Sequence, residues 1–487
     1  MPDPPGEDDR PSAAERRGRR PWRDTIRPGS GLRLAPAAYE LVRELMRFDV
    51  REHLRLLRFI AKWVVLGAVV GVVAGLASAT FLTLLARATE ANTETPWLLW
   101  LLPLGGFAVG LVYRYGGGRS SQGNNLILEQ VHGIDPTGPH PGHQWVPRRL
   151  APLVLFGTLV THLFGGSAGR EGTAIQMSGS LNDGVARLLG LRGEDRRLLL
   201  VAAIAGGFGS VFGVPLAGAL FALEVQTLGR IRHDALVPAL AASIVGNEVV
   251  HRLDWPHDVT PTIELGAFGI EGVLLLKVAA AGLAFGLASA LFSELVIGLK
   301  RSFATLVSWS PARPLIGGVL VIALTGLVGS RDYLGLSLPL IEDALTGGDV
   351  LLWAFALKIV FTAVTLGSGF QGGEVTPLFV IGATLGATAA HVLGAPVELL
   401  AAVGFVAVFA GATNTPLACT VMGIELFGVG GLPYIAVGCA VSYVFSAHRG
   451  IYEAQLLHTD GDTGPTRLGD HQERRRHWLP GPRRPRR

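Results

Sequence analysis

The sequence predicts an all-α integral membrane protein, and its composition and its interrupted apolar runs support this fold class. Of 487 residues, 49% are hydrophobic and 16% are charged, whereas soluble domains carry about 25% charged residues. The 65 glycines and 29 prolines cut many apolar runs below the roughly 20 residues that span a bilayer. Short, broken helices are typical of transporters whose half-helices end near the membrane midplane. Close helix packing through small residues is a second explanation of the glycines.

The apolar runs lie between two polar tails and predict one large membrane domain over residues 58–456. Residues 1–57 form the first tail, in which a Pro-, Gly- and charge-rich start precedes an amphipathic surface helix over 36–57. Residues 457–487 form a basic tail that is too short and too polar for a folded domain. The runs cover 58–88, 97–115, 148–165, 197–226, 235–250, 270–298, 314–330, 350–366, 376–394, 398–426 and 431–447.

Basic residues crowd both tails and predict that both termini lie on the cytoplasmic side of the cell's inner membrane. Positively charged segments that flank membrane spans stay in the cytoplasm, and two cytoplasmic ends require an even number of crossings. Nucleic-acid binding is the alternative use of such tails, but we expect no nucleic-acid partner because basic flanks are ordinary in membrane proteins. The arginines are Arg16, Arg17, Arg19 and Arg20 at the start and Arg474, Arg475, Arg476, Arg483, Arg484, Arg486 and Arg487 at the end.

An internal repeat predicts two halves of similar plan, over about 58–250 and 266–456. The segment PLAGALFALE recurs as PLACTVMGIE near residue 416, and upstream of each copy GREGTAIQMSG matches GGEVTPLFVIG. The second match pairs Glu171 with Glu374, 203 residues later. Chance similarity between apolar segments is the alternative, but two matches in the same order at near-equal offsets argue against it. Repeated halves with a site at their junction are a known transporter architecture.

The segment GGSAGREGT, which ends at Thr173, places ionisable residues in a glycine-rich turn between apolar runs. Arg170 and Glu171 are expected at membrane depth, where ionisable side chains are costly and mark transport or proton paths. Gly169 and Gly172 permit an extended turn before a helix that starts near Thr173. Such a helix start offers free backbone N–H groups and a positive dipole end to an anion. The alternative is an Arg170–Glu171 pair that reaches the membrane interface at a helix end.

The second half repeats this pattern in GSGFQGGEVTP, residues 367–377. Its glycines lead into a helix that starts near Thr376, where Pro377 suits the first helical turn. Glu374 is again ionisable in an apolar setting, and Val375 separates it from Thr376. Either Glu374 takes part in transport, or it is an N-terminal acid that the helix dipole favours.

Two asparagines and a tyrosine complete the set of candidate residues. Asn124 and Asn125 follow a third glycine-rich lead, GGGRSSQG, which lacks the GK[ST] of a phosphate loop and therefore predicts no nucleotide site. Their amides either face a permeating ion or cap the helix that follows. Tyr452 comes after the last apolar run, where an aromatic residue is usually an anchor at the membrane interface.

The sequence predicts neither a cofactor nor a metal site. The two cysteines, Cys419 and Cys439, lie in apolar runs without metal-ligand spacing. The histidines His162, His391 and His448 are scattered, and no HExxH motif occurs. A membrane-embedded enzyme is therefore only a remote alternative.

These motifs, in this order, resemble the CLC family of chloride channels and proton-coupled anion antiporters over about residues 60–455. GREG at 169–172 resembles the family's gating-glutamate motif, GGEVTP at 372–377 its second anion-binding motif, and Tyr452 its central tyrosine. The resemblance implies many tilted, broken helices in two inverted-topology repeats. It also implies a homodimer in the lipid bilayer, with one pore per subunit and with Glu171 as the gate.

Several positions depart from the chloride-transporting members and resemble the fluoride-exporting branch of the family. GNNLI at 123–127 stands where those members show a GSGIP-like stretch, so Asn124 replaces the pore serine, and GREGT replaces GREGP. Val225 stands where exchangers commonly carry an internal proton-transfer glutamate. Fluoride is small and strongly hydrated, so its dehydration requires close donors such as an amide, a hydroxyl and helix-start N–H groups.

The resemblance therefore implies a fluoride/proton antiporter that exports fluoride from the cytoplasm in exchange for protons. A chloride/proton antiporter or a passive anion channel of the same fold is the alternative. Glu171 is expected to gate the path and to carry the proton, while Glu374 either donates a hydrogen bond to fluoride or helps to move the proton. The expected anion-binding residues are Asn124, Asn125, Gly169, Arg170, Gly172, Thr173, Val375, Thr376 and Tyr452.

Overall fold

The structure is a computed structural model, and it describes residues 50–133, 145–253, 263–266, 268–457 and 466–470. Most of the expected surface helix over 36–57 lies outside these residues, and its last part, from Val50, belongs to the long helix α2 (Val50–Glu94). The chain divides into a unit up to Arg58 and a unit from Phe59 on. The fold below is that of the second unit.

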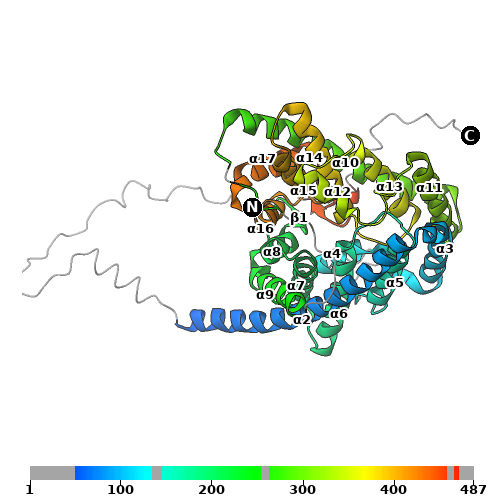
Figure 1. The fold of residues 1–487 in the computed structure, drawn as a ribbon. Helices are drawn as coiled ribbons and strands as arrows, with labels where there is room; N and C mark the ends of the chain where they lie inside the picture. Colours follow the sequence, from blue (N-terminus) through cyan, green and yellow to red (C-terminus); the bar gives the residue numbers. More distant parts are fainter. Residues whose placement is uncertain (1–49, 134–144, 254–262, 267, 458–465, 471–487) are drawn as a thin grey trace, which may run out of the picture. The chain divides into compact units, whose positions relative to one another are not determined.

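Helices that are mostly shorter than a membrane span make up the first half of this unit (Figure 1). After α2 come η1 (Pro96–Leu101), α3 (Leu102–Val112), η2 (Tyr113–Gly117), η3 (Gly118–Gln122), α4 (Asn124–His132), α5 (Leu150–Leu163), α6 (Glu171–Leu188), α7 (Gly193–Phe212), α8 (Pro215–Glu224), η4 (His233–Ala235) and α9 (Leu236–Leu253).

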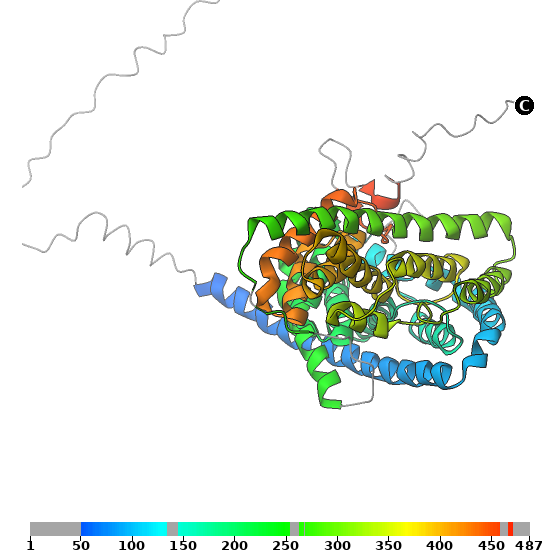
Figure 2. The same ribbon diagram turned by 45° about the horizontal axis from the view of Figure 1, so that its top comes forward.

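The second half has a similar succession of helices, which Figure 2 shows from another side. They are α10 (Gly272–Leu306), α11 (Ala312–Val328), α12 (Leu338–Thr346), α13 (Ala354–Ser368), α14 (Val375–Leu393), α15 (Val397–Thr413), α16 (Pro416–Phe427), η5 (Val429–Gly431) and α17 (Leu432–Phe445). Within the described residues, four helical segments are long and apolar enough to cross a membrane: His53–Glu94, Pro96–Gln122, Gly272–Leu306 and Val375–Leu393.

The apolar run over 197–226 and its counterpart in the second half are each divided into two helices. Gly213 (φ 72°) ends α7 and Asn414 (φ 58°) ends α15, both in the left-handed backbone conformation. A proline then opens the next helix, Pro215 in α8 and Pro416 in α16, because the first helical turn does not need its N–H group. The same break occurs in both halves, as the internal repeat predicts.

The two halves cap each other where α8 packs against α16. Glu425 near the end of α16 accepts hydrogen bonds from the N–H groups at the start of α8, and Glu224 at the end of α8 does the same for α16. A carboxylate at a helix N-terminus satisfies free donors and is favoured by the helix dipole. The bonds run from Leu216 (2.9 Å) and Ala217 (2.7 Å) to Glu425, and from Leu417 (3.1 Å) and Ala418 (2.8 Å) to Glu224.

Stacked phenylalanines and close glycine contacts hold the centre of the unit together. Phe208 stacks on Phe221 with 4.3 Å between ring centroids, and Phe379 stacks on Phe405 at 4.1 Å. Helices α14 and α15 approach so closely that a Cβ at Gly382 would lie 2.1 Å from the Gly404 carbonyl oxygen. Only glycine permits this contact, which fixes α14 and therefore the position of its N-terminus.

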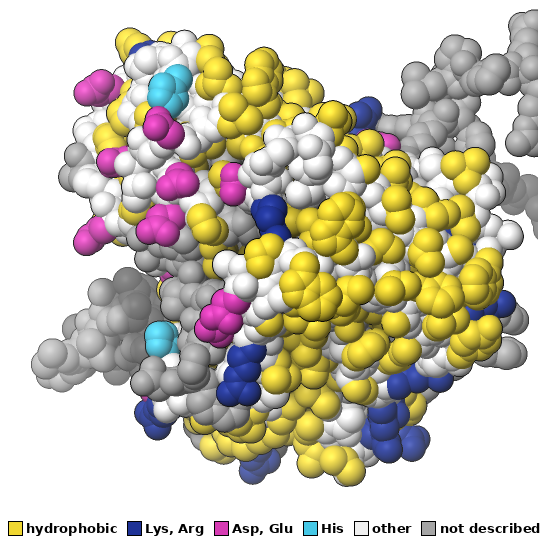
Figure 3. Space-filling view, turned by 45° about the vertical axis from the view of Figure 1, so that its right-hand side comes forward, with side chains coloured by type: hydrophobic (Ala, Val, Ile, Leu, Met, Phe, Trp, Pro, Cys, Tyr) yellow, Lys and Arg dark blue, Asp and Glu magenta, His cyan; other side chains and the backbone are white. Residues whose placement is uncertain are grey.

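The surface of the unit exposes many large hydrophobic side chains. Leu276 (73%) and Leu291 (57%) of α10 and Leu327 (84%) of α11 are examples. Figure 3 shows a face on which hydrophobic side chains cover a broad continuous area, with Lys and Arg at its lower margin. Exposed apolar patches of this extent mark membrane or protein contacts.

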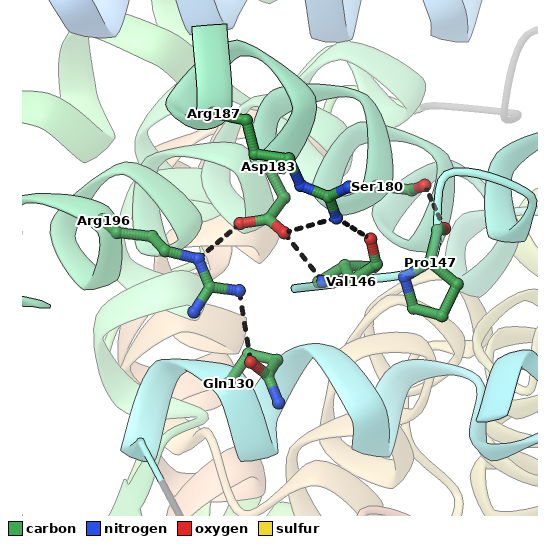
Figure 4. A network of polar contacts seen from close by, with 7 residues as sticks. All are labelled: Gln130, Val146, Pro147, Ser180, Asp183, Arg187 and Arg196. Carbon is green, nitrogen blue, oxygen red and sulfur yellow. Dashed lines mark hydrogen bonds and ion pairs between the residues drawn. The ribbon is translucent and has the colours of Figure 1, made fainter. Parts of the chain in front are cut away.

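A buried ionic network at the end of α6 ties together α4, α6, α7 and the segment before α5 (Figure 4). Asp183 accepts hydrogen bonds from Arg196 Nε at 2.6 Å, from the Val146 N–H at 2.7 Å and from Arg187 at 3.4 Å. Arg187 also donates to the Val146 carbonyl, and Arg196 donates to Gln130 Oε1 at 3.1 Å. Every charge in this network therefore has a partner, as buried charges require.

A small sheet joins described segments that follow α17 to the first half. Strand β1 (Thr227–Leu228) pairs in parallel with β2 (Leu456–Leu457), which pairs antiparallel with β3 (Thr466–Arg467). Arg467 also lies 3.2 Å from Glu129 of α4. The segment 466–470 thus packs on the membrane domain, although we expected this domain to end at residue 456.

Candidate functional site

Two glycine-rich loops, one from each half, meet at the centre of the unit. The Gly169 N–H donates to the Gly373 carbonyl at 2.7 Å, and the Gly373 N–H donates back to Gly169 at 2.7 Å. A Cβ at Gly169 would lie 2.8 Å from Pro377 Cδ and 3.0 Å from the Gly373 carbonyl oxygen, so a side chain does not fit there. This pairing brings the N-termini of α6 and α14 together.

The Glu171 carboxylate reaches across to the N-terminus of the opposite helix. The Thr376 N–H donates to Glu171 Oε2 at 3.0 Å, and the Thr376 hydroxyl lies 2.7 Å from both carboxylate oxygens. The Arg170 N–H donates to the same carboxylate at 3.2 Å. Backbone N–H groups at a helix start form an anion site, and here the glutamate occupies it.

Arg170 and Glu171 form a buried pair. Arg170 Nε lies 3.5 Å from Glu171 Oε1, and the two side chains are 2% and 0% exposed. The alternative of a pair that reaches the membrane interface is therefore wrong, because the loop pairing holds both residues inside the protein. The helix also begins earlier than expected, at Glu171 instead of Thr173.

Asn124 and Glu374 approach Gly172 from different segments. A Cβ at Gly172 would lie 2.9 Å from Asn124 Nδ2 and 3.6 Å from Glu374 Oε2, so the glycine leaves room for both polar groups. Helix α14 begins at Val375 with Glu374 at its N-cap position, and no side-chain capping bond forms there. The Glu374 side chain therefore does not act as a cap.

A cavity of about 800 Å³ adjoins these groups, and Asn124, Glu374 and Tyr452 line it. Its lining also includes the exposed cations Arg114 and Lys300. Positive charge along a concave surface raises the local concentration of anions. The cavity is thus suited to receive an anion and to lead it toward the paired helix starts.

Tyr452 lies inside the protein and not at its surface. Its side chain is 3% exposed, and its ring packs against Phe221 with 6.5 Å between centroids. The Tyr452 hydroxyl and Asn124 Oδ1 are buried, and neither has a hydrogen-bond partner among the described residues. The alternative of an interface anchor is wrong for Tyr452, and both groups remain available to a ligand.

Other candidate residues are already engaged within the protein. The Thr173 hydroxyl lies 2.8 Å from the Thr158 hydroxyl, and Asn125 Oδ1 accepts the Ala454 N–H at 3.1 Å. Val375 is fully buried and apolar. Neither asparagine caps α4, because Gly123 takes the N-cap position and no side-chain capping bond forms. These side chains position the site instead of offering it free polar atoms.

The loop before Glu171 also has the G-x-S-x-G spacing of the motif that carries the nucleophilic serine of many hydrolases. In those enzymes the motif forms a sharp turn between a strand and a helix. Ser167 is its serine, and its hydroxyl lies 2.9 Å from the Thr362 hydroxyl. His162, the nearest histidine in the sequence, contacts the carbonyls of Thr158 (2.9 Å) and Ala168 (3.1 Å) instead of the serine. The loop also follows a helix, α5, so this serine lacks the setting of a nucleophile.

Two buried polar residues, one of which lines the cavity, were not among the sequence candidates. Gln176 of α6 is 6% exposed and lines the cavity. It lies five residues after Glu171 in a motif that pointed only to the glutamate. Lys358 of α13 is fully buried and donates to the Tyr333 and Gly335 carbonyls and to the Ser337 hydroxyl, at 3.3, 2.9 and 2.8 Å. A lone lysine in an apolar run was the only available signal.

A family model described as voltage gated chloride channel matches residues 104–447. The chain belongs to this CLC family. It is 46% identical over 420 residues to a chloride/fluoride channel protein of Pseudomonas syringae pv. tomato, covering 85% of this chain and 90% of the relative. It is 28% identical over 426 residues to the H⁺/Cl⁻ exchange transporter ClcA of Vibrio vulnificus, covering 81% and 88%.

Solved structures of CLC proteins share the fold of this chain. A crystal structure of a CLC-type fluoride/proton antiporter matches with a TM-score of 0.77 and 33% identity, covering 82% of this CLC protein and 98% of the other chain. A slow cyanobacterial Cl⁻/H⁺ antiporter matches with a TM-score of 0.63 and 21% identity, covering 80% and 94%. The resemblance and the predicted CLC fold of broken helices are thereby confirmed.

Proposed function

We propose that this CLC protein exports fluoride from the cytoplasm in exchange for protons. One observation carries the proposal: the Glu171 carboxylate occupies the donors of Thr376 at a helix start, beside a cavity lined by Asn124, Glu374 and Tyr452. The names of two relatives support the choice of ion, since one is a chloride/fluoride channel protein and the other a fluoride/proton antiporter.

Glu171 and a small anion compete for the same donors. As a carboxylate, Glu171 accepts the Thr376 N–H and hydroxyl and thereby excludes an anion. A proton on the carboxyl removes its negative charge and weakens these bonds, because hydrogen bonds to ionised groups are about twice as strong as neutral ones. The protonated side chain leaves, and fluoride takes its place at Thr376. Each exchange couples one proton-binding event to one anion-binding event.

The polar groups that line the cavity replace the water that fluoride must lose. The Tyr452 hydroxyl offers a neutral donor that has no hydrogen-bond partner among the described residues, and the Asn124 amide offers a second donor through its NH₂ group. Glu374 holds a proton at the cavity end of the path, from where it donates to fluoride or passes the proton toward Glu171. If fluoride flux of the Glu374→Gln variant keeps the pH dependence of the unaltered protein, this role of Glu374 is excluded.

Ion efflux from liposomes tests the function. Vesicles that hold the purified protein and are loaded with fluoride or chloride are followed with ion electrodes, while pH is recorded in parallel. Rapid fluoride loss with little chloride loss and opposite proton movement is expected, and Glu171→Gln should abolish the proton movement. Comparable chloride loss would instead identify a chloride/proton antiporter of the same fold, which is the activity in the name of the 28% identical relative. Anion flux without proton movement would identify a passive channel.

The wider setting follows from the same proposal. The membrane domain over 58–456 lies in the inner membrane with both tails in the cytoplasm, works without a cofactor and carries out no enzymatic reaction. Two subunits associate through α8 and α16, which expose Leu216 (48%) and Leu417 (54%). Reporter fusions at the two termini test the orientation. Cross-linking of a single cysteine introduced at Leu216 in a cysteine-free background tests the dimer, because one cysteine can form a link only between subunits.

A further inference from the structure

Gln176 is a buried polar residue that the proposed exchange of Glu171 for fluoride does not use. It lies on α6, the helix that begins with Glu171, and its side chain lines the cavity. The residue is 6% exposed, and its Oε1 has no hydrogen-bond partner among the described residues. Leaving a buried polar group unpaired is unfavourable, so such a group indicates that a ligand or water binds there.

The carboxamide of Gln176 lies against the turn that leads into α4. A Cβ at Gly123 would lie 3.3 Å from Gln176 Nε2 and 3.6 Å from its Oε1. Gly123 has φ 59° and ψ −132°, a conformation that glycine adopts easily, and it leaves the start of α4 without a side-chain cap. The amide of Gln176 and the uncapped start of α4 therefore face the same part of the cavity.

Asn124 follows Gly123 and, like Gln176, has a side-chain oxygen without a hydrogen-bond partner among the described residues. Its Oδ1 is buried without a partner, and its Nδ2 points toward Gly172. Two carboxamides, from α6 and α4, thus line one cavity, and each has an unpaired oxygen. A carboxamide that rotates about its terminal bond offers either its NH₂ or its oxygen to the same space, so these two groups suit an anion that keeps part of its hydration water.

We propose that Gln176 is a specificity-determining residue that contacts the anion in the cavity before the anion reaches Asn124. The Gln176 NH₂ donates to the anion, and its oxygen accepts a hydrogen bond from a water that the anion retains. Close donors favour fluoride over chloride, because the smaller ion permits a shorter hydrogen bond. This inference rests on the proposed function in taking fluoride as the transported ion.

Flux measurements at a series of fluoride and chloride concentrations test the role of Gln176. The Gln176→Met variant keeps the length of the side chain and removes both polar groups. We expect its half-saturating fluoride concentration to rise about 10- to 100-fold, the loss that one hydrogen bond to a charged partner implies. The half-saturating chloride concentration should change less, so the preference of the protein for fluoride over chloride should fall. Gln122→Ala is the matched control, because Gln122 lines the same cavity but is exposed.

The outcomes separate a contact with the anion from a structural role. If Gln176→Met lowers only the maximal rate or the melting temperature and keeps both half-saturating concentrations, the inference is overturned. If that variant does not fold, Gln176→Glu is used instead, since it has the same shape and should weaken fluoride binding through its negative charge. Unchanged fluoride affinity in Gln176→Glu also overturns the inference. If the unaltered protein moves no fluoride, both the proposed function and this inference are overturned, whereas unchanged affinities in the Gln176 variants of a protein that does move fluoride overturn the inference alone.

Discussion

Replacing Asp183 by asparagine is expected to destabilise the protein, because Asp183 is the only acidic residue in the network of Figure 4. Its carboxylate is 0% exposed and neutralises Arg196, which is 6% exposed. Removing one partner of a buried ion pair costs about 3–5 kcal/mol. Asparagine keeps one oxygen, which can accept from Arg196 or from the Val146 N–H but satisfies both less well than two oxygens do. We therefore expect Asp183→Asn to lower the free energy of unfolding by about 3 kcal/mol.

Thermal unfolding of the purified protein measures this loss. With an unfolding entropy of about 2.1 cal/mol/K per residue, a loss of about 3 kcal/mol lowers the Tm of a chain of 487 residues by roughly 3 °C. Asp195→Asn is the matched control: Asp195 pairs with Lys62 at 2.7 Å, but both side chains are 42% exposed. An exposed pair contributes about 0–1 kcal/mol, so the Tm of the control should fall by at most about 1 °C.

A double variant decides whether the ion pair itself is responsible. Asp183→Asn combined with Arg196→Met removes both charges of the closest pair. The Tm of the double variant should be higher than the sum of the two separate losses predicts, because the buried Arg196 charge no longer lacks a partner. Equal Tm losses in Asp183→Asn and Asp195→Asn, or strict additivity in the double variant, would refute the reasoning. Fluoride flux per folded protein should change little, since the network lies outside the cavity lining.

Four further substitutions test contacts between the two halves and within the second half. Thr376→Val removes a hydroxyl that lies 2.7 Å from the Glu171 carboxylate, so the half-saturating fluoride concentration in the flux assay should rise about tenfold. Glu224→Gln and Glu425→Gln each weaken two hydrogen bonds from helix-start N–H groups. Each substitution should lower the free energy of unfolding by about 1 kcal/mol, which corresponds to a fall in Tm of about 1 °C. Gly382→Ala places a methyl group about 2.1 Å from a backbone oxygen, so folded protein should be absent after purification by size exclusion.

The sequence predicted the helices and the motifs of the site better than it predicted their limits. The expected boundary at residue 57 falls inside α2, because residues 50–94 form one continuous helix in which charged positions give way to apolar ones. The run over 197–226 is two helices, since Gly213 and Pro215 together interrupt it. Hydropathy averaged over a window does not detect such a break, although both residues are visible in the sequence.

The contacts within the site depended on tertiary structure. Asn124 and Asn125 are neighbours with the same side chain, yet Asn125 binds the Ala454 N–H while Asn124 keeps an unpaired oxygen at the cavity. A helix turns by about 100° between successive residues, so the two amides face different partners. The bond between Glu171 and Thr376 joins residues 205 positions apart, and only the fold defines it.

The internal repeat explains how Glu171, the proposed gate, differs from the structural caps. At α8 and α16 the arrangement is reciprocal, because Glu224 and Glu425 each cap the opposite helix. At α6 and α14 it is not. Glu171 is the first residue of α6, but Glu374 is the N-cap residue of α14, so Val375 is the structural counterpart of Glu171.

This shift by one residue gives the two glutamates different roles. Glu171 reaches the opposite helix, and in the proposed exchange its charge decides whether Thr376 binds a carboxylate or an anion. An apolar residue, Val375, occupies the equivalent place in the second half and is fully buried. Glu374 is thereby released from capping and lines the cavity. A pair of reciprocal caps would hold both helices permanently, whereas in the proposed mechanism a single cap leaves one anion site that opens when Glu171 takes up a proton.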